Sequence, residues 1–352
     1  MEYQSSSSQT KDECGSTFGS KMLTMSYQAS KGWSSPIIKD YAPITISPSA
    51  QCLHYGQTVF EDMIAYQIND NFHIFKPFEH FEKFNQSLNR IEMPAINKSA
   101  LLFGIQQLIN QERQLFDLHE QHPVNIRTVM FASENKLGVS KSDTYELITF
   151  LSPLPKKLNC QTPELIKAHV EDEYVKSVTG GAGFTQFGGN YAASYAAKSK
   201  AAQFGYDHVL WLDGTERSYI EELNNMNIFF VINHTLITPA LDGITVPGVT
   251  RQSVIDLAKE LGYQIEERQI SIEEVLQSYK DGLLTEVFST STLNAITPVC
   301  EIKYKDNILT IHNNKIGPIT QHLFTTYTSI QQGKLPDIHQ WNYTIEREPI
   351  EM

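Results

Sequence analysis

The sequence GGAGFTQFGG occupies residues 180–189 and runs directly into an alanine-rich segment, residues 191–204. Its five glycines leave the backbone free to place N–H groups ahead of the following helix, whose positive dipole end suits an anion. A tight turn that packs a strand against a helix is the purely structural alternative. The spacing matches neither G-x-G-x-x-G nor G-x-x-x-x-G-K-[ST], so the loop predicts neither a dinucleotide nor a nucleoside triphosphate.

Two further segments in the same half of the chain have anion-binding character. VPGVTR (residues 246–251) precedes a predicted helix over residues 251–261, which Thr250 can cap. Four hydroxyl residues, 289–292, follow a strand-like stretch over residues 283–288. A structural cap and an ordinary turn are the alternatives for these segments. Together, the three segments predict a phosphorylated ligand held mainly by backbone and hydroxyl groups.

Outward from these segments, the periodicity of apolar residues predicts a mixture of strands and helices. Residues 58–67 and 72–75 are typical of a hairpin. A proline-rich stretch, residues 152–157, can continue neither a strand nor a helix and therefore predicts a linker. The other predicted elements are helices over residues 79–92, 101–111, 191–204 and 271–277, and strands over residues 145–151, 171–178, 209–212 and 227–232.

These elements predict a mixed α/β protein with two unequal domains. We expect a small N-terminal α/β domain over residues 26–152, a linker over residues 153–163 and a larger C-terminal domain over residues 164–352. Residues 1–25 contain a serine run and no apolar core of a secretory signal, so they are predicted to be a disordered leader.

Composition excludes several classes of function. The chain has 352 residues, of which 41% are hydrophobic and 19% charged, which is typical of a globular protein. Its net charge of −12 argues against a nucleic-acid partner, and no apolar run is long enough to cross a bilayer. The four cysteines lie far apart, so no zinc site, other metal site or disulfide framework is predicted, and a cytoplasmic location fits best.

Five motifs, in this order, resemble the branched-chain amino acid aminotransferases, which are pyridoxal-phosphate enzymes of fold type IV. They are HYGQTVFE (residues 54–61), GGNY (188–191), VLWLDG (209–214), MNIF (226–229) and GVTR (248–251). The resemblance covers residues 47–299. It implies the two-domain fold of that family, with the cofactor in a cleft between the domains. It also implies an amino acid or oxo acid substrate and a homodimer whose partner subunit completes the site.

The resemblance assigns roles to individual residues. Glu222 matches the carboxylate that pairs with the pyridine nitrogen, and Tyr191 matches the tyrosine that hydrogen-bonds the phenolic oxygen of the ring. The expected phosphate contacts are the backbone amides of Val249 and Thr250, the hydroxyl of Thr292, and Lys83, which stands where the family usually has arginine. The positions expected around the substrate pocket are Tyr55, Phe60 and Arg127.

One departure from the family determines the functional prediction. Gln186 stands where the resemblance expects the lysine that binds the cofactor covalently and then transfers a proton between substrate and cofactor. The lone pair of an amide nitrogen is delocalised, so glutamine is neither a nucleophile nor a useful base. Loss of acid–base catalysis alone costs roughly two to four powers of ten in rate. We therefore expect pyridoxal or pyridoxamine phosphate, if bound, to be held non-covalently, and ordinary transamination to be nearly absent.

No neighbouring lysine is an obvious substitute for the missing one. Lys198 and Lys200 lie on the helix that follows, and Lys198 begins roughly 10 Å further along it. Lys176 lies on the predicted preceding strand, where we expect an exposed or phosphate-facing side chain.

Other positions have diverged from the family pattern as well. These further departures indicate natural divergence rather than a single substitution at position 186. They are Asp62, Asn125, Thr128, Leu223, Asn224, Asn225, Ser289, Ser291 and Leu293.

Three functions remain open on the sequence alone. The first is a non-transaminating member of the family that retains the ligand pocket for altered chemistry, binding or regulation. The second is an active aminotransferase that exchanges the amino group of a branched-chain or related amino acid with 2-oxoglutarate by means of another lysine. The third is a dimeric scaffold without a ligand. Glu222 argues against the scaffold, because a buried carboxylate without a ring nitrogen to pair with is costly.

Overall fold

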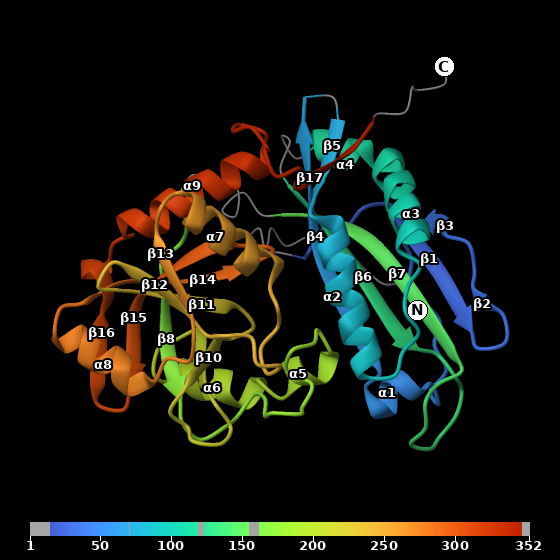
Figure 1. Ribbon diagram of the computed structural model, residues 1–352. Helices are drawn as coiled ribbons and strands as arrows, with labels where there is room; N and C mark the ends of the chain where they lie inside the picture. Colours follow the sequence, from blue (N-terminus) through green and yellow to red (C-terminus); the bar gives the residue numbers. More distant parts are fainter. Residues whose placement is uncertain (1–14, 70, 119–122, 155–161, 347–352) are drawn as a thin grey trace.

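Two large β-sheets, each with its own helices, form the two halves of the molecule in the computed structural model (Figure 1). The structure describes residues 15–69, 71–118, 123–154 and 162–346. Within these residues, the first sheet contains eight strands and the second contains nine. The mixed α/β architecture predicted from the sequence is confirmed.

The first sheet has the strand order β17-β5-β4-β6-β7-β1-β2, with β3 paired to β1. Helices α2 and α3 pack against one face, and their apolar side chains share one core with the strands. The α2 residues Phe81, Phe84 and Leu88 are almost completely buried, as their helical spacing predicts. The elements are β1 (Lys21–Gln28), β2 (Gly32–Trp33), β3 (Ile37–Asp40), α1 (Gln51–Tyr55), β4 (Thr58–Ile68), β5 (Asn71–Phe75), α2 (Pro77–Arg90), α3 (Lys98–Gln111), α4 (Arg113–Leu118), β6 (Val124–Ala132), β7 (Thr144–Pro153) and β17 (Asn342–Ile345).

The second sheet has the order β10-β9-β8-β15-β14-β11-β12-β13, with β16 paired to β15. Two separate apolar cores, one containing residues of α8 and the other residues of α7 and α9, enclose it. The elements are β8 (Ile166–Glu171), α5 (Gly188–Ala192), α6 (Tyr195–Gln203), β9 (His208–Leu212), β10 (Ile220–Leu223), β11 (Asn227–Ile232), β12 (Thr235–Thr238), α7 (Val249–Glu260), β13 (Gln264–Glu267), α8 (Ile272–Lys280), β14 (Leu284–Ser291), β15 (Ala295–Tyr304), β16 (Asn307–Thr310), the 3-10 helix η2 (Ile311–Asn314) and α9 (Pro318–Gln331).

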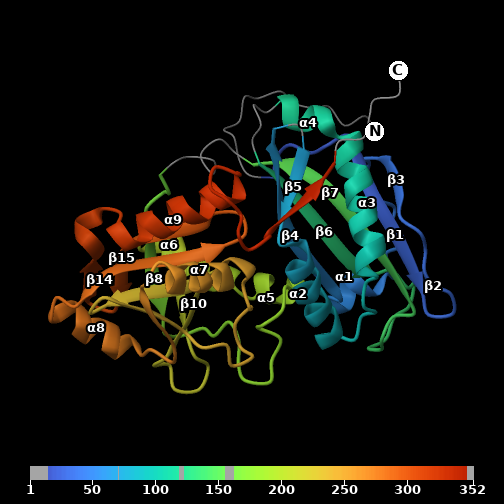
Figure 2. The ribbon, with the colours of Figure 1, turned by 45° about the horizontal axis from the view of Figure 1, so that its top comes forward.

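The two ends of the chain depart from the predicted domain boundaries. Strand β1 begins at Lys21, inside the predicted leader, and pairs with β7 over seven residues from Met22 to Gln28. Residues 1–14 lie outside the described part. The chain returns from α9 to the first sheet, where β17 pairs with β5 (Figure 2). The predicted C-terminal domain therefore contributes one strand to the other half. Part of the predicted linker, residues 155–161, also lies outside the described residues.

Two predicted elements are wrong in detail. The expected strand over residues 171–178 is not formed: β8 ends at Glu171, because the carboxylate of Glu171 accepts the backbone N–H groups of Glu173 and Tyr174 and turns the chain. The expected helix over residues 191–204 is divided into α5 and α6. At the division, the Ser194 hydroxyl donates to the Tyr191 carbonyl at 2.7 Å. No helix in the described residues is both long enough and apolar enough to cross a membrane.

Candidate functional site

A cavity of about 450 Å³ lies between the two halves of the molecule. The first half contributes side chains from β4, α2 and β6, and the second contributes the glycine-rich loop, α5, the start of α7 and the end of β14. Eight of the ten predicted site residues line it: Phe60, Lys83, Arg127, Gln186, Tyr191, Val249, Thr250 and Thr292. These residues are far apart in the chain, and the fold brings them together in one cavity, as the family motifs imply.

The other two predicted residues do not line the cavity. Tyr55 is 38% exposed, and its hydroxyl accepts the backbone N–H of Gly138 at 2.8 Å. Glu222 is buried and forms an ion pair with Lys176, which is also buried. The expectation that the Lys176 side chain is exposed or phosphate-facing is wrong: burial lowers its pKa to about 7, against the opposing charge of Glu221.

Gln186 is held in place through both its backbone and its side chain. Its N–H donates to the Ser87 hydroxyl on α2 at 3.1 Å, and its carbonyl accepts the N–H of Phe60 on β4 at 3.3 Å. Its side-chain amide donates to Glu61 at 3.0 Å and accepts from the Tyr191 hydroxyl at 3.2 Å. Both ends of the amide are therefore satisfied, and Gln186 joins the second half of the molecule to the first.

Glu61 is the centre of a buried polar network. One carboxylate oxygen lies 2.8 Å from Lys83 Nζ and 2.6 Å from His80 Nδ1, and the other accepts from Gln186. Glu61 is 1% exposed, so its charge needs these partners. The pKa of His80 is lowered, chiefly by burial and despite the opposing charge of Glu61. The lowered pKa disfavours a positive charge on His80, and Lys83 forms the ion pair with the same oxygen of Glu61.

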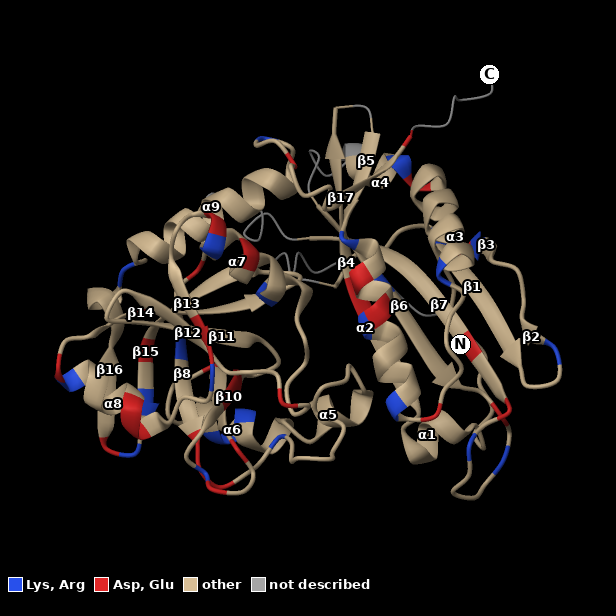
Figure 3. Ribbon diagram, in the orientation of Figure 1, with Lys and Arg blue, Asp and Glu red and all other residues tan. Residues whose placement is uncertain are grey.

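Sequence reasoning did not assign roles to Glu61 and His80. A signal was present in the helix: His80, Lys83 and Ser87 are three and four residues apart and therefore share one face of α2. Figure 3 shows charged residues of both signs along α2 and acidic residues on the neighbouring β4. Polar residues on the buried face of an amphipathic helix predict an internal partner, and here the partner is Glu61 on β4.

The start of α7 faces the cavity without a side-chain cap. Gly248, Val249 and Thr250 line the cavity, and Gly248 is the N-cap residue. A Cβ at position 248 would lie 2.2 Å from the Asn227 side-chain oxygen, so any other residue here would have to displace the Asn227 side chain. The Thr250 hydroxyl instead accepts from Tyr327 at 3.3 Å. The expected cap by Thr250 is therefore wrong, and the first N–H groups of α7 remain available to an anion.

Hydroxyl side chains lie opposite this helix start. Thr290, Ser291 and Thr292 line the cavity, and β14 extends to Ser291, so the ordinary turn that was the alternative for this stretch begins only at Thr292. Thr290 is 2% exposed, and its hydroxyl has no hydrogen-bond partner among the described residues. A buried hydroxyl without a protein partner indicates a ligand or solvent partner.

The fit to pyridoxal or pyridoxamine phosphate differs from one end of the cavity to the other. The start of α7 and the hydroxyls of Thr290 and Thr292 fit the phosphate. Tyr191 fits beside the ring, and burial raises the pKa of its hydroxyl far above the usual value, which keeps it a hydrogen-bond donor. The cavity lining offers one amine, Lys83, and that amine is paired with Glu61. The described lining therefore fits the phosphate and the ring, and offers no unpaired amine.

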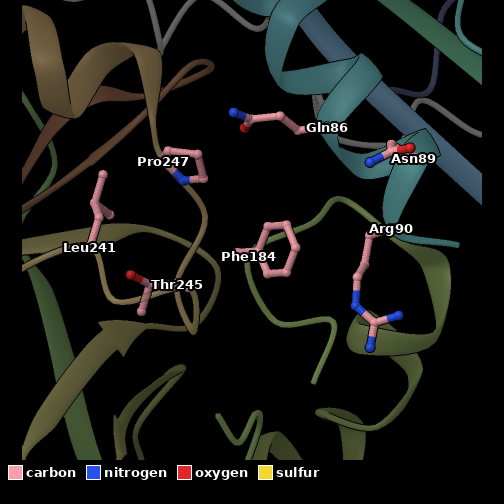
Figure 4. Close-up of a pocket in the computed structure, with 8 residues that line it drawn as sticks. Gln86, Asn89, Arg90, Phe184, Leu241, Thr245 and Pro247 are labelled. Carbon is pink, nitrogen blue, oxygen red and sulfur yellow. The ribbon is translucent and has the colours of Figure 1, made fainter. Parts of the chain in front are cut away.

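A second, smaller hollow of about 330 Å³ lies beyond the segment that precedes α7 (Figure 4). Gln86, Asn89 and Arg90 on α2 lie on one side of it, and Leu241, Thr245 and Pro247 lie on the other, with Phe184 between them. The Arg90 guanidinium donates to the carbonyls of Gly180 and Gly181 at 3.0 and 3.1 Å. Arg90 thus holds the glycine-rich loop against α2.

Comparison with known proteins agrees with this arrangement. The amino-transferase class IV family model matches residues 58–302. A probable branched-chain-amino-acid aminotransferase of Staphylococcus epidermidis is 47% identical over 333 residues, covering 95% of this chain and 93% of the relative. Branched-chain-amino-acid aminotransferase 2 of Bacillus subtilis is 42% identical over 328 residues, covering 93% and 90%.

Solved structures show the same fold. The branched-chain amino acid aminotransferase of Escherichia coli superposes with a TM-score of 0.75 at 23% identity and covers 92% of this chain and 99% of its own. The enzyme of Thermobaculum terrenum in its PLP-form has a TM-score of 0.77 at 23% identity and covers 94% and 99%. With its five motifs, its cavity and these relatives, the chain belongs to the branched-chain aminotransferase family of the class IV aminotransferases.

Proposed function

We propose that this protein is a non-transaminating member of its family that binds pyridoxal or pyridoxamine phosphate without a covalent bond. The observation that carries the proposal is Gln186: its amide faces the cavity, and both its donor and its acceptor are already engaged by Glu61 and Tyr191. An amide supplies neither the nucleophile nor the base that an amino-group transfer needs.

The phosphate end supports retained ligand binding. The N–H groups at the start of α7 and the hydroxyls of Thr290 and Thr292 would hold the phosphate oxygens. When bound, the cofactor supplies an electron-withdrawing ring. Tyr191 would lie beside that ring and contact it through its hydroxyl oxygen, because its one proton is donated to Gln186. Lys83 would contribute its charge from beside Glu61 rather than as a direct contact to the phosphate.

The ring-nitrogen end supports loss of the ordinary reaction. Glu222 is paired with Lys176 instead of lining the cavity, so the charge expected to protonate the ring is already neutralised within the protein. This pair weakens the argument against a scaffold, because one oxygen of Glu222 has a partner without any ligand, whereas the other is buried without a hydrogen-bond partner among the described residues. The unpartnered Thr290 hydroxyl at the phosphate end favours a ligand-binding protein over a scaffold.

An active aminotransferase remains the second candidate, and one observation favours it: the 47% identity to a probable branched-chain aminotransferase. It would require an amine at the cavity. Burial lowers the pKa of Lys176 to about 7, which makes its ammonium group easier to deprotonate than that of an exposed lysine. Its contact with Glu222, outside the cavity lining, argues against this use.

Titration of the purified full chain with pyridoxal phosphate and with pyridoxamine phosphate by isothermal calorimetry tests the proposal. A covalent bond would make pyridoxal phosphate, which is an aldehyde, bind more tightly than pyridoxamine phosphate. Because we expect no such bond, the two dissociation constants should agree within about threefold. Turnover of leucine with 2-oxoglutarate should stay at the level of the buffer control. Measurable turnover would overturn the proposal, and failure of both ligands to bind would support the scaffold.

The expected homodimer and cytoplasmic location are likewise proposals. The molar mass of the purified protein, measured by light scattering at micromolar concentration, tests the dimer. The mass of a monomer would contradict it. Fractionation of the source cells tests the location.

A further inference from the structure

The second hollow is separated from the larger cavity by two stretches of backbone. In the glycine-rich loop, Phe184 lines the second hollow and Gln186 lines the cavity. Within residues 245–248, alternate residues line the hollow and the cavity in the same way. The second hollow is therefore a neighbouring space with its own lining, and the proposed cofactor site leaves it unused.

Two amide side chains line the second hollow from α2 (Figure 4). Gln86 and Asn89 are three residues apart and therefore lie on one face of the helix. Neither side chain has a hydrogen-bond partner among the residues that the structure describes. Each amide carries a donor and an acceptor, so it can pair with a ligand edge that presents an acceptor beside a donor.

The rest of the lining is largely apolar. Phe184 contributes an aromatic ring, and Leu241 and Pro247 contribute apolar surface across from the amides. Thr245, which is 5% exposed, adds one hydroxyl residue to this side. An aromatic ring near free amides suits a flat polar ring, because such a ring can stack on one face and form hydrogen bonds at its edge.

The lining favours an uncharged ligand. Arg90 is the one charged residue among the described lining residues, and its Nε and Nη2 donate to the carbonyls of Gly181 and Gly180. That edge of the guanidinium is therefore already engaged and does not receive a carboxylate or phosphate as a two-donor fork. The same lining contains no acidic residue that would pair with an ammonium group.

We infer that the second hollow binds the adenine ring of an uncharged nucleoside. Adenine presents the donor N6 beside the acceptor N7, and a glutamine or asparagine amide pairs with that edge through two hydrogen bonds. The flat ring would stack on Phe184, next to Leu241 and Pro247. A nucleoside has no phosphate, so the net charge of −12 does not oppose its binding. The inference does not rest on the proposed function.

Calorimetry on the unaltered full chain, with adenosine as the probe, tests the inference. We expect a dissociation constant of about 0.1–1 mM. Inosine replaces the N6 amine by a carbonyl, and 7-deazaadenosine replaces N7 by carbon. Each should bind at least about fivefold more weakly than adenosine. No adenosine binding at about 5 mM, or equal binding of either analogue, would overturn the inference.

A double variant locates the site. Gln86→Ala/Asn89→Ala removes both amides from exposed positions of α2, so the fold should persist while adenosine binds at least about tenfold more weakly. Gln203→Ala, at an exposed position of α6 outside the lining, is the control and should leave the affinity unchanged. Unchanged affinity in the double variant would overturn the inference. If the double variant does not fold, the comparison of adenosine with its two analogues decides.

Two further ligands separate this site from the alternatives. Adenosine should bind protein saturated with pyridoxamine phosphate as tightly as the free protein, within about twofold. Exclusion of adenosine by pyridoxamine phosphate would overturn the inference, whereas failure of pyridoxamine phosphate to bind would overturn the cofactor proposal alone. AMP adds a phosphate and should bind no more tightly than adenosine, because the Arg90 edge is engaged. AMP binding about tenfold tighter would overturn the assignment to an uncharged nucleoside.

Discussion

The side-chain amide of Gln186 donates a hydrogen bond of 3.0 Å to Glu61, a carboxylate buried between β4 and α2. Glu61 also holds Lys83 at 2.8 Å, so the one amine in the cavity lining is paired with the carboxylate that fixes the glutamine. Gln186, which stands in place of the expected lysine, and Lys83 thus both contact the same carboxylate, Glu61.

Gln186→Lys should restore covalent capture of the cofactor. The new ammonium group would lie near Glu61, which already accepts from the amide at that position, while the side chain still faces the cavity. After incubation with pyridoxal phosphate and reduction with borohydride, mass spectrometry should find one pyridoxyl group on residue 186. Gln186→Met, which has similar length and no amine, is the control. An unlabelled Gln186→Lys protein would show that the cavity does not hold the aldehyde in the family's orientation.

Glu61→Gln should destabilise the protein by about 3 kcal/mol in urea unfolding, because it leaves the buried ammonium group of Lys83 without an anion. The double variant Glu61→Gln/Lys83→Met removes that charge and should recover part of the loss. If the double variant is no more stable than Glu61→Gln alone, Lys83 does not depend on Glu61 in the manner described.

Thr290→Val should weaken binding of pyridoxamine phosphate without destabilising the fold. The Thr290 hydroxyl is buried and has no described partner, so its removal breaks no internal hydrogen bond. We expect a loss of affinity of about fivefold to tenfold by calorimetry. Thr238→Val is the contrasting variant, since the Thr238 hydroxyl donates to Ile228 at 2.8 Å, and it should cost about 1 kcal/mol of stability. Unchanged affinity in Thr290→Val would remove Thr290 from the phosphate site.

The buried carboxyl of Glu221 should make stability depend on pH. Burial, with Asp242 and Asp213 adding to it, raises the pKa of Glu221 from its ordinary value of 4.5 to about 8. The folded state therefore holds this proton more tightly than the unfolded state. The resulting stabilisation is complete below pH 4.5 and is lost as the pH rises through about 8. Glu221→Gln should match the unaltered protein at about pH 4 and be more stable by about 1–3 kcal/mol at about pH 8.5. A difference that does not change with pH would contradict this.

Much of the fold was predictable because its signals are local. The apolar spacing of α2 and the β4–β5 hairpin both predict the elements seen. The family motifs correctly bring Phe60, Tyr191 and Thr250 to one cavity, since each motif lies on a wall of it. The return of β17 to the first sheet was not predictable, because four residues at the end of a chain carry no local signal of their distant partner.

The site was less predictable, because its changed residues compensate one another across the structure. Asp62 and Asn125 each look like isolated departures in the sequence, yet Asn125 donates to Asp62 at 2.9 Å. Lys176 lies ten positions before Gln186 in the sequence, and its contact with Glu222 depends on a turn that begins at Glu171. Such contacts depend on how two segments pack, which spacing along the chain does not specify. The coupling of Asp62 with Asn125 supports natural divergence.

Borohydride reduction of the unaltered protein, after incubation with one equivalent of pyridoxal phosphate, tests the central claim most directly. Peptide mapping by mass spectrometry should find no pyridoxyl group on Lys83 or Lys176, and any surface labelling should persist when pyridoxamine phosphate is added in excess. A label on either lysine that pyridoxamine phosphate displaces would contradict the account, because it would mean that the cavity contains a working amine after all.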